Sequence, residues 1–354
     1  MSIERYNARA AEIYWQQAWD AQNVFAARND DARPRYHLPE AFPYRGLVRH
    51  CAMMDVIARY KRARGFKVLP PAEGDHAAVA QMRLRSMGLS FRCSVETATF
   101  VVTDSGRRQA TVHAGGLEVD PEDIIDAYGV DATRWFMLSD LPPDREMVWT
   151  ENGIRGAWRF VHRLWRLING AEQYSDGAPA RPTVFSAPAL DIRRTAHRAL
   201  MQVSGNIERL RFNVCVARIY AFVRTLEAVM TGSPKPASPD LKFAAREAAE
   251  ILVQLFHPMM PHLAEECWAA LGRQSLLAIQ SWPVPEADLL VDDNATLPVH
   301  VNGRRQADVT VAQDARNGDI EASVLALDAV RRALGGKAPR KVIIVPQRII
   351  NVVA

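Results

Sequence analysis

The sequence has few cysteines, no long apolar run and no internal repeat. Its 354 residues include four cysteines, which are far apart and form no C-x-x-C pair. A disulfide framework or a zinc knuckle is therefore not expected, and a reducing cytoplasm is the expected location. No apolar stretch approaches the ~20 residues that span a bilayer. The polar N-terminus also lacks the apolar segment of a signal peptide, so we expect no membrane partner.

Lysine is absent between Lys67 and Lys235, and arginine supplies the positive charge there. The net charge is only +4, but residues 151–230 hold twelve arginines against six acidic residues. Residues 329–354 hold six basic residues and no acidic one. Two local positive regions favour a polyanionic partner. The alternative is that both are solvated faces of an arginine-rich chain.

One group of residues suggests metal ligands: His257, His262, Glu265, Glu266 and Cys267. Its spacing matches no strong ligand pattern, and prolines at 258 and 261 redirect the chain between the two histidines. We expect these residues to be structural, and we expect no metal and no cofactor.

The first third of the chain favours an α/β fold. A helix is predicted within residues 1–29, with Ile13, Trp19 and Val24 as candidate buried positions. A strand at 35–44, a helix at 53–64 and a strand at 66–69 make a βαβ pattern. A further helix is predicted at 75–87 and a strand in TFVVTD at 99–104, and Gly115-Gly116 resembles a flexible joint more than a phosphate loop.

Three helices are predicted between residues 120 and 170. Asp120 and Pro121 begin the first helix, Gly129 ends it, and Asp131 is the expected cap of the second. The third has an apolar face at Ile154, Trp158, Val161, Trp165 and Ile168. A positive row accompanies this face at helical spacing: Arg155, Arg159, Arg163 and Arg166.

The middle of the chain predicts an antiparallel helical bundle. Helices are expected from Leu190 to about 204 and from 207 to Met230, the latter with Leu210, Val214, Ala217 and Ala221 on its apolar face. A third helix has its apolar side at Leu241, Ala244, Ala245, Ala248, Leu252 and Leu255. Pro258 ends that helix, and Pro261 begins another through Trp268.

Residues 296–354 predict a small α+β domain. Leu297, Val299 and Val301 alternate before the Asn302-Gly303 hairpin turn, and Ala307, Val309 and Val311 alternate after it. A helix face follows at Ile320, Val324, Leu327, Val330 and Leu334, ended by Gly335-Gly336. A buried strand is expected at 341–345.

The segment DPEDIIDAYGVDATRWFMLSDLPPDREMVW at 120–149 closely resembles bacterial leucyl-tRNA synthetases, which are class I aminoacyl-tRNA synthetases. HPMMPHLAEECWAALG is similar to a bundle helix of that family. LPVHVNGRRQADVTV and APRKVIIVPQRIINVVA are similar to its C-terminal domain, which contacts the tRNA elbow. The resemblance covers about residues 1–100, where stretches of the family's sequence are deleted or replaced, and residues 118–354 almost without gaps.

Both signatures of the family's ATP site are missing. Where the resemblance places HIGH, this sequence has Arg45-Gly46-Leu47, with Leu47 in place of the second histidine and His50 out of register. Thr111–Leu117 precedes the resembling segment where KMSKS should stand. Adenylate formation needs positive charge at the reacting phosphate, which the KMSKS lysines supply in the family. The editing domain has no counterpart either.

The sequence therefore predicts a truncated Rossmann-like nucleotide-binding remnant at 1–117, a stem at 118–150, an anticodon-binding-like bundle at 151–285 and a tRNA-contacting α+β domain at 296–354. We expect a cytoplasmic, leucyl-tRNA synthetase-like pseudoenzyme that binds tRNA and not DNA. The predicted RNA-binding residues are Arg155, Arg159, Arg163, Arg166, Arg304, Arg305, Lys337, Arg340, Lys341 and Arg348. The alternatives are an active leucine–tRNA ligase, which would need ATP, and a protein-interaction module or decaying paralogue without RNA binding.

Overall fold

The computed structural model describes residues 5–26, 31–38, 47–69, 112–114, 117–119, 121–139, 149–170, 180–232, 237–291, 294–312, 317–345 and 348–353. By its contacts the chain divides into two compact units, Met1–Glu286 and Ala287–Ala354. Each unit has a hydrophobic core of its own. Among the described residues, no helix is long and apolar enough to cross a membrane.

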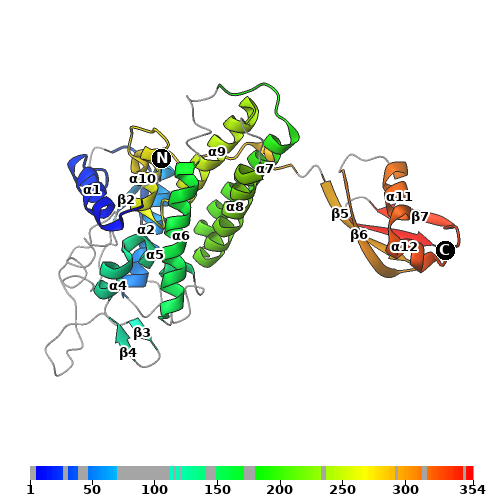
Figure 1. Ribbon diagram of the computed structural model, residues 1–354, viewed down its shortest axis with the longest axis horizontal. Helices are drawn as coiled ribbons and strands as arrows, with labels where there is room; N and C mark the ends of the chain where they lie inside the picture. Colours follow the sequence, from blue (N-terminus) through cyan, green and yellow to red (C-terminus); the bar gives the residue numbers. More distant parts are fainter. Residues whose placement is uncertain are drawn as a thin grey trace. The chain divides into compact units, whose positions relative to one another are not determined.

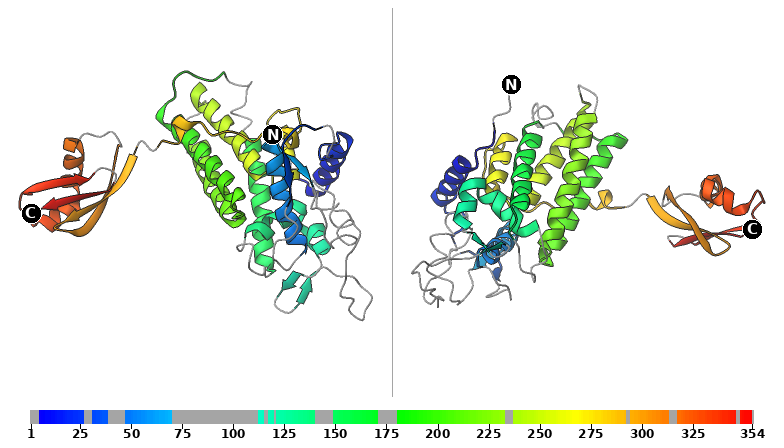
Figure 2. Two further views of the ribbon diagram at one scale, coloured as in Figure 1. Left: turned by 180° about the vertical axis from the view of Figure 1, so that it is seen from behind. Right: turned by 60° about the horizontal axis from the view of Figure 1, so that its bottom comes forward.

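The first unit is mostly helical, as Figures 1 and 2 show. Its helices are α1 (Ala8–Ala21), α2 (Leu47–Ala63), α4 (Pro121–Tyr128), α5 (Val130–Ser139), α6 (Glu151–Gly170), α7 (Ala187–Glu208), α8 (Phe212–Gly232), α9 (Pro239–Phe256), α10 (Pro261–Ala270) and the 3₁₀ turn η2 (Leu277–Ile279). Its strands are β1 (Arg35–His37), β2 (Lys67–Leu69), β3 (Val112–Ala114) and β4 (Leu117–Val119).

The strand–helix–strand pattern at the start of the unit is confirmed. β1 and β2 are parallel, with Tyr36 opposite Val68, and α2 connects them. Most of α2 is buried. β3 and β4 are antiparallel, with Ala114 opposite Leu117. The helix predicted at 75–87 and the strand predicted at 99–104 lie outside the described residues.

The burial prediction for α1 was wrong at one position. Trp19 is buried, whereas Ile13 is 56% exposed. The buried side of the helix holds Ala11, Trp15 and Trp19, spaced four residues apart. Ile13 is about 200° around the helix from Ala11, since successive residues differ by about 100°, and this turns it to solvent.

Gly129 separates α4 from α5, as predicted, with a φ of +84°. A Cβ atom at this glycine would lie 2.8 Å from the Cβ of Ala8, so α1 also requires the absence of a side chain. The predicted cap of α5 was wrong, because the backbone N–H of Val130 donates to Oε1 of Glu12 at 2.6 Å. Asp131 instead binds α10, 131 residues away in sequence.

The long helix α6 has a buried face of Ile154, Ala157, Phe160, Val161, Leu164, Leu167 and Ile168. The two predicted tryptophans, Trp158 and Trp165, are only half-buried. Phe160 stacks on Trp135 of α5, with ring centroids 5.0 Å apart. A Cβ atom at Gly153 would overlap the Phe136 ring, so glycine allows the start of α6 to approach α5 closely.

Helices α7, α8 and α9 pack against one another in the bundle. The predicted start of α8 was wrong, since Ile207 belongs to α7 and α8 begins at Phe212. Its predicted apolar face was also wrong, because Ala217 and Ala221 are exposed. The buried face consists of Phe212, Cys215, Val216, Ile219, Phe222, Val223, Leu226 and Met230. Large side chains gain more from burial than alanine does, and they decide which side of the helix faces inward.

The predictions for α9 and α10 are confirmed. All six apolar positions predicted for α9 are buried. α9 ends before Pro258, and Pro261 is the first residue of α10. These prolines cannot donate a backbone hydrogen bond, which explains where one helix ends and the next can begin.

The second unit is a sheet with helices. It comprises η3 (Ala287–Leu289), β5 (Asn294–Val301), β6 (Arg304–Ala312), α11 (Asn317–Ala326), α12 (Asp328–Leu334), β7 (Lys341–Val345) and β8 (Ile349–Val353). The strand order is β6-β5-β8-β7, with β5 and β8 parallel and the other pairs antiparallel. Asn302 and Gly303 both have positive φ, at 49° and 80°, as the predicted hairpin turn requires.

Two details of this unit differ from prediction. The helix face expected from Ile320 to Leu334 is divided between α11 and α12, with Leu327 between them as the N-cap of α12. The strand β7 is not buried: Lys341, Ile343 and Val345 are exposed. It lies at the edge of the sheet, where one long side of the strand has no neighbouring strand.

Candidate nucleic-acid interface

The arginine row of α6 lies on the surface, but its four members differ in their partners. Arg155 pairs with Glu151 on the same helix at 2.9 Å. Arg163 pairs with Glu227 of α8, Nε to Oε1 at 2.8 Å. Arg159 and Arg166 are exposed and have no acidic partner among the described residues. Two of the four arginines thus already form ion pairs within the unit, and two keep their charge available for another partner.

The six predicted cations of the second unit are Arg304, Arg305, Lys337, Arg340, Lys341 and Arg348, and all are exposed. Only Arg305 has an acidic partner among the described residues, Asp308 at 2.8 Å. The hairpin turn places Arg304 at the start of β6, and the αL residue Gly335 ends α12 before Lys337. Exposed cations without acidic partners can contact phosphates with little desolvation.

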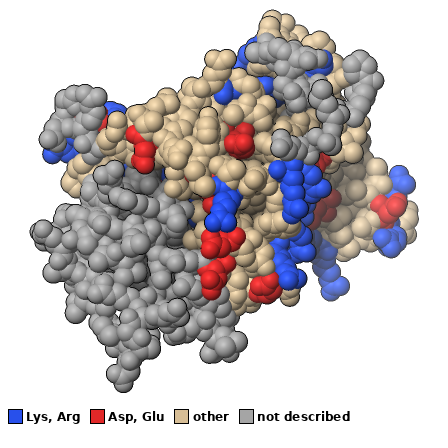
Figure 3. Space-filling model, turned by 60° about the vertical axis from the view of Figure 1, so that its left-hand side comes forward, with Lys and Arg blue, Asp and Glu red and all other residues tan. Residues whose placement is uncertain are grey.

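Figure 3 shows how cations gather on one face of the molecule. Blue Lys and Arg side chains form a band right of the centre of that view, and red acidic side chains lie beside it. A phosphate backbone following such a face would contact the cations and avoid the acids.

The residues near 260 that resemble metal ligands form internal contacts. The Asp131 carboxylate binds His262 Nδ1 at 3.0 Å and accepts the backbone N–H of Leu263 at 2.6 Å. Glu265 accepts from Trp19 Nε1 at 2.9 Å and from the N–H of Leu277 at 2.7 Å. Asp131 thereby satisfies one of the free N–H groups at the start of α10, as an N-cap side chain would.

Because Asp131 is buried, its removal should be costly. Asp131→Ala should lower the free energy of unfolding by about 2–4 kcal/mol, because it removes the hydrogen-bond acceptor of the buried Leu263 N–H and the partner of His262 Nδ1. Urea denaturation followed by circular dichroism measures this loss. Asp123→Ala, at an exposed position on α4, is the matched control and should change stability by less than about 0.5 kcal/mol. Equal effects of the two substitutions would contradict the capping role.

A second buried network was not predicted from the sequence. Asp55 of α2 accepts from Arg59 Nε and from Arg134 Nη2, each at 2.8 Å. Arg134 also donates to the carbonyls of Pro258 and Met259, at 2.8 and 3.0 Å. The Arg134 guanidinium therefore satisfies carbonyls where the chain leaves α9. It ties α2, α5 and the α9–α10 corner together, a structural role that supports the bundle.

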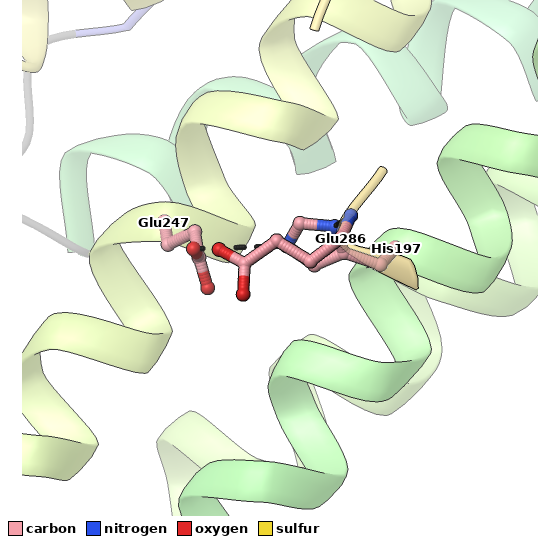
Figure 4. Close-up of side chains that lie close together, drawn as sticks. All are labelled: His197, Glu247 and Glu286. Carbon is pink, nitrogen blue, oxygen red and sulfur yellow. Dashed lines mark hydrogen bonds and ion pairs between the residues drawn. The ribbon is translucent and has the colours of Figure 1, made fainter. Parts of the chain in front are cut away.

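One group in the described residues has the side chains of a cation site: His197, Glu247 and Glu286, whose ligand atoms lie within 4.8 Å of one another (Figure 4). Arg193 already occupies both carboxylates, at 2.6 Å from Glu247 and 2.9 Å from Glu286. The Glu286 backbone N–H donates to His197 Nδ1 at 2.9 Å. Burial opposes ionisation of Glu247, but His197 and Arg193 outweigh it and lower its pKa. The group is an ion-pair network that joins α7, α9 and the segment at Glu286.

Glu12 is the most strongly perturbed carboxyl group near α6. Burial, followed by the charge of Asp131, raises its pKa to about 8, and the Val130 N–H opposes this shift. The folded pKa lies above the ordinary value of 4.5, so the folded state holds a proton that the unfolded state has released. The stability that this proton provides is complete below the unfolded pKa and is lost as the pH rises through about 8.

The urea midpoint should therefore fall from about pH 6 to about pH 9, and Glu12→Gln should reduce that fall. Glutamine keeps the size of the side chain and cannot ionise. The measurement is a series of urea titrations of both proteins across this range. An equal fall in the variant would show that Glu12 is not the group responsible.

Comparison with known proteins places the bundle in a class. The family model for the anticodon-binding domain of tRNA ligase matches residues 190–323, from α7 into α11. The part of the helical unit from α7 onward thus resembles the anticodon-binding domain of tRNA ligases.

Sequence relatives identify the family within this class. A leucine–tRNA ligase of Rhodopseudomonas palustris (strain BisB5) is 59% identical over 239 residues, which is 66% of this chain and 27% of the relative. One of Bradyrhizobium sp. (strain ORS 278) is 53% identical over 283 residues, 80% of this chain and 32% of the relative. The chain belongs to the leucyl-tRNA synthetase family. It spans about a third of the length of these relatives.

A solved structure agrees with this assignment. The ternary complex of Agrobacterium radiobacter K84 agnB2 LeuRS with tRNA and LeuAMS matches with a TM-score of 0.57 and 29% identity. The match covers 73% of this chain and 33% of that one. The predicted family is confirmed, and the predicted RNA-binding residues stay a prediction.

Proposed function

We propose that this chain binds tRNA through its bundle and its second unit and does not aminoacylate it. The observation that carries the proposal is the match of residues 190–323 to the anticodon-binding domain of tRNA ligase. The exposed cations of α6 and of the second unit support it, because phosphate contacts supply most of the sequence-independent affinity for nucleic acid. The finer assignment is that Arg159 and Arg166 contact phosphates directly and that Arg155 and Arg163 do so as members of ion pairs.

The absence of aminoacylation follows from the chemistry that the sequence lacks. The HIGH and KMSKS signatures have no counterparts, and no lysine lies between Lys67 and Lys235. Arg107 and Arg108 are close in sequence to the missing KMSKS, but a planar guanidinium does not replace a mobile ammonium group. We assign β1, α2 and β2 to a remnant of the nucleotide-binding fold, and we place the protein in the cytoplasm.

The second candidate is an active leucine–tRNA ligase. Identities of 52–59% to proteins of that name favour it. The two candidates differ in their need for ATP and leucine, so an activity assay separates them.

Competition between nucleic acids tests the proposal. Labelled bulk tRNA bound to the full chain should be displaced by unlabelled tRNA. An equal concentration of phosphate in duplex DNA should displace it much less, because A-form RNA and B-form DNA space their phosphates differently. Equal displacement by both would reduce the interaction to general polyanion binding and contradict the tRNA assignment.

A further inference from the structure

A cavity of about 660 Å³ lies between α1, the junction of α4 with α5, and α6. This volume is in the range of small-molecule sites. Its lining combines two arginines, Arg5 and Arg9, with the aromatic side chains Tyr6, Tyr128, Trp158 and His162. Figures 1 and 2 show α1 on the same side of the unit as α4 and α5. The capping of α10 uses none of these side chains.

Arg5 and Trp158 form a cation–π pair at the cavity, which we call the Arg5–Trp158 platform. The Arg5 guanidinium carbon lies 5.3 Å from the centre of the Trp158 ring, and Arg5 itself is exposed. Trp158 packs edge-on against His162, with centroids 4.3 Å apart. A guanidinium backed by a tryptophan presents its outer plane to a flat ligand. Aromatic rings and arginine planes are the surfaces on which proteins stack unpaired nucleobases.

The charge of the cavity suits a phosphate group. Two arginines line it against the carboxyl groups of Glu12 and Asp126. Glu12 holds its proton at neutral pH because burial raises its pKa to about 8, so one acid opposes the two arginines. Burial, then the charges of Arg5 and Arg166, lower the pKa of His162, which keeps the imidazole neutral and able to stack.

The two α6 residues that line the cavity, Trp158 and His162, lie beside the arginine row on the helix. On α6, Arg155 and Arg166 are about 20–40° further around the helix than His162, and Arg159 is about 60° further. Tyr128 at the rim donates to Glu151 at 2.5 Å, and Glu151 pairs with Arg155. A strand whose phosphates follow these arginines would pass directly beside the opening.

We propose that this cavity binds one unstacked nucleotide of single-stranded RNA, with its base on the Arg5–Trp158 platform and its phosphate toward Arg9. The inference rests on the proposed RNA binding and names a nucleotide site for it. The shared chemistry is a nucleoside monophosphate, which either a strand or a free nucleotide could present. The neighbouring arginine row favours the strand, because it offers contacts to the flanking phosphates that a free nucleotide lacks.

The test uses the full chain with three probes: oligoadenylate, AMP and bulk tRNA. Arg5→Gln and Trp158→Leu should each weaken oligoadenylate binding about 10-fold, the effect of losing one stacked base. The matched controls are Arg33→Gln and Trp149→Leu, which should bind as the wild type does. Arg33 is exposed and pairs with Asp31, and Trp149 is half-buried and does not line the cavity. Fluorescence anisotropy measures the affinity, and circular dichroism checks that each variant folds. If Trp158→Leu does not fold, the affinity of Arg5→Gln for oligoadenylate still tests the site.

The outcomes separate this inference from the proposed function. Unchanged oligoadenylate binding by a folded Arg5→Gln variant would overturn the site. If the wild type binds tRNA but neither oligoadenylate nor AMP, the site is wrong and the proposed function stands. If oligoadenylate binds with the expected variant effects but tRNA does not, the site stands and the proposed function fails. Equal affinity for AMP and oligoadenylate would overturn the RNA source of the nucleotide.

Discussion

Leucine-dependent ATP–pyrophosphate exchange by the purified chain should not rise above that of a buffer control. The exchange requires leucyl-adenylate, and its formation places negative charge on a pentacoordinate phosphate that the enzyme must stabilise. Removing groups that stabilise such charge costs on the order of 10²–10³ in rate for each group. Here the counterparts of two whole signatures are missing, so the combined loss should leave no measurable rate.

The assay needs a positive control, because a null result also arises from inactive reagents. A full-length leucyl-tRNA synthetase in the same buffer should exchange readily. Adding it in trace amounts to the sample with this chain should restore exchange, which excludes an inhibitor in the preparation. Leucine-dependent exchange that grows with the concentration of this chain alone would establish the active ligase and contradict the account.

Replacing Arg340 and Lys341 by glutamine should weaken tRNA binding about 10-fold at low salt. The pair is exposed, and removing two phosphate contacts should also reduce the salt dependence by about 0.7–0.9 per contact. Glutamine preserves much of the side-chain length. The Arg340 backbone N–H still donates to the Val353 carbonyl at 2.8 Å, so the edge of the sheet is kept.

The matched control removes the same charge from the same unit. Arg331 and Arg332 of α12 are exposed and donate to the carbonyls of Leu325 and Asp328. Arg331→Gln/Arg332→Gln should weaken binding less than the first pair does. An equal loss of tRNA affinity from both pairs would show that only the net charge of the unit matters and that Arg340 and Lys341 do not contact tRNA specifically.

The helices were predictable where large apolar residues and prolines agree. The apolar pattern of α9 predicted both its buried face and its end, because all six predicted apolar positions are buried and Pro258 prevents continuation of the helix. The face of α8 was not predictable from Ala217 and Ala221, since a methyl group gains little from burial on either side of a helix. The prediction that Ile13 is buried was wrong for a related reason. Trp15 and Trp19 are larger, and their burial decides which side of α1 faces the core.

The polar contacts were least predictable, because their partners are distant in sequence. Asp131 is a residue type that caps helices and stands at the start of α5, yet it caps α10 by accepting the Leu263 N–H. At the start of α5, Glu12 of α1 accepts the Val130 N–H instead. Arg163 pairs with Glu227, 64 residues away. The exposed positions of the cations followed from helical spacing and turn type. Which cations are already paired depends on which helices pack together, and the sequence alone does not show which helices are neighbours.

The salt dependence of tRNA binding shows whether the exposed cations of the chain bind the phosphates of tRNA. The dissociation constant of the full chain for bulk tRNA should be measured from about 50 mM to about 200 mM salt, beside a control protein of similar size and net charge. We expect saturable binding that is tighter than that of the control at every salt concentration and that weakens steeply as the salt concentration rises. Affinity and salt dependence no different from those of the control would contradict the proposed tRNA binding.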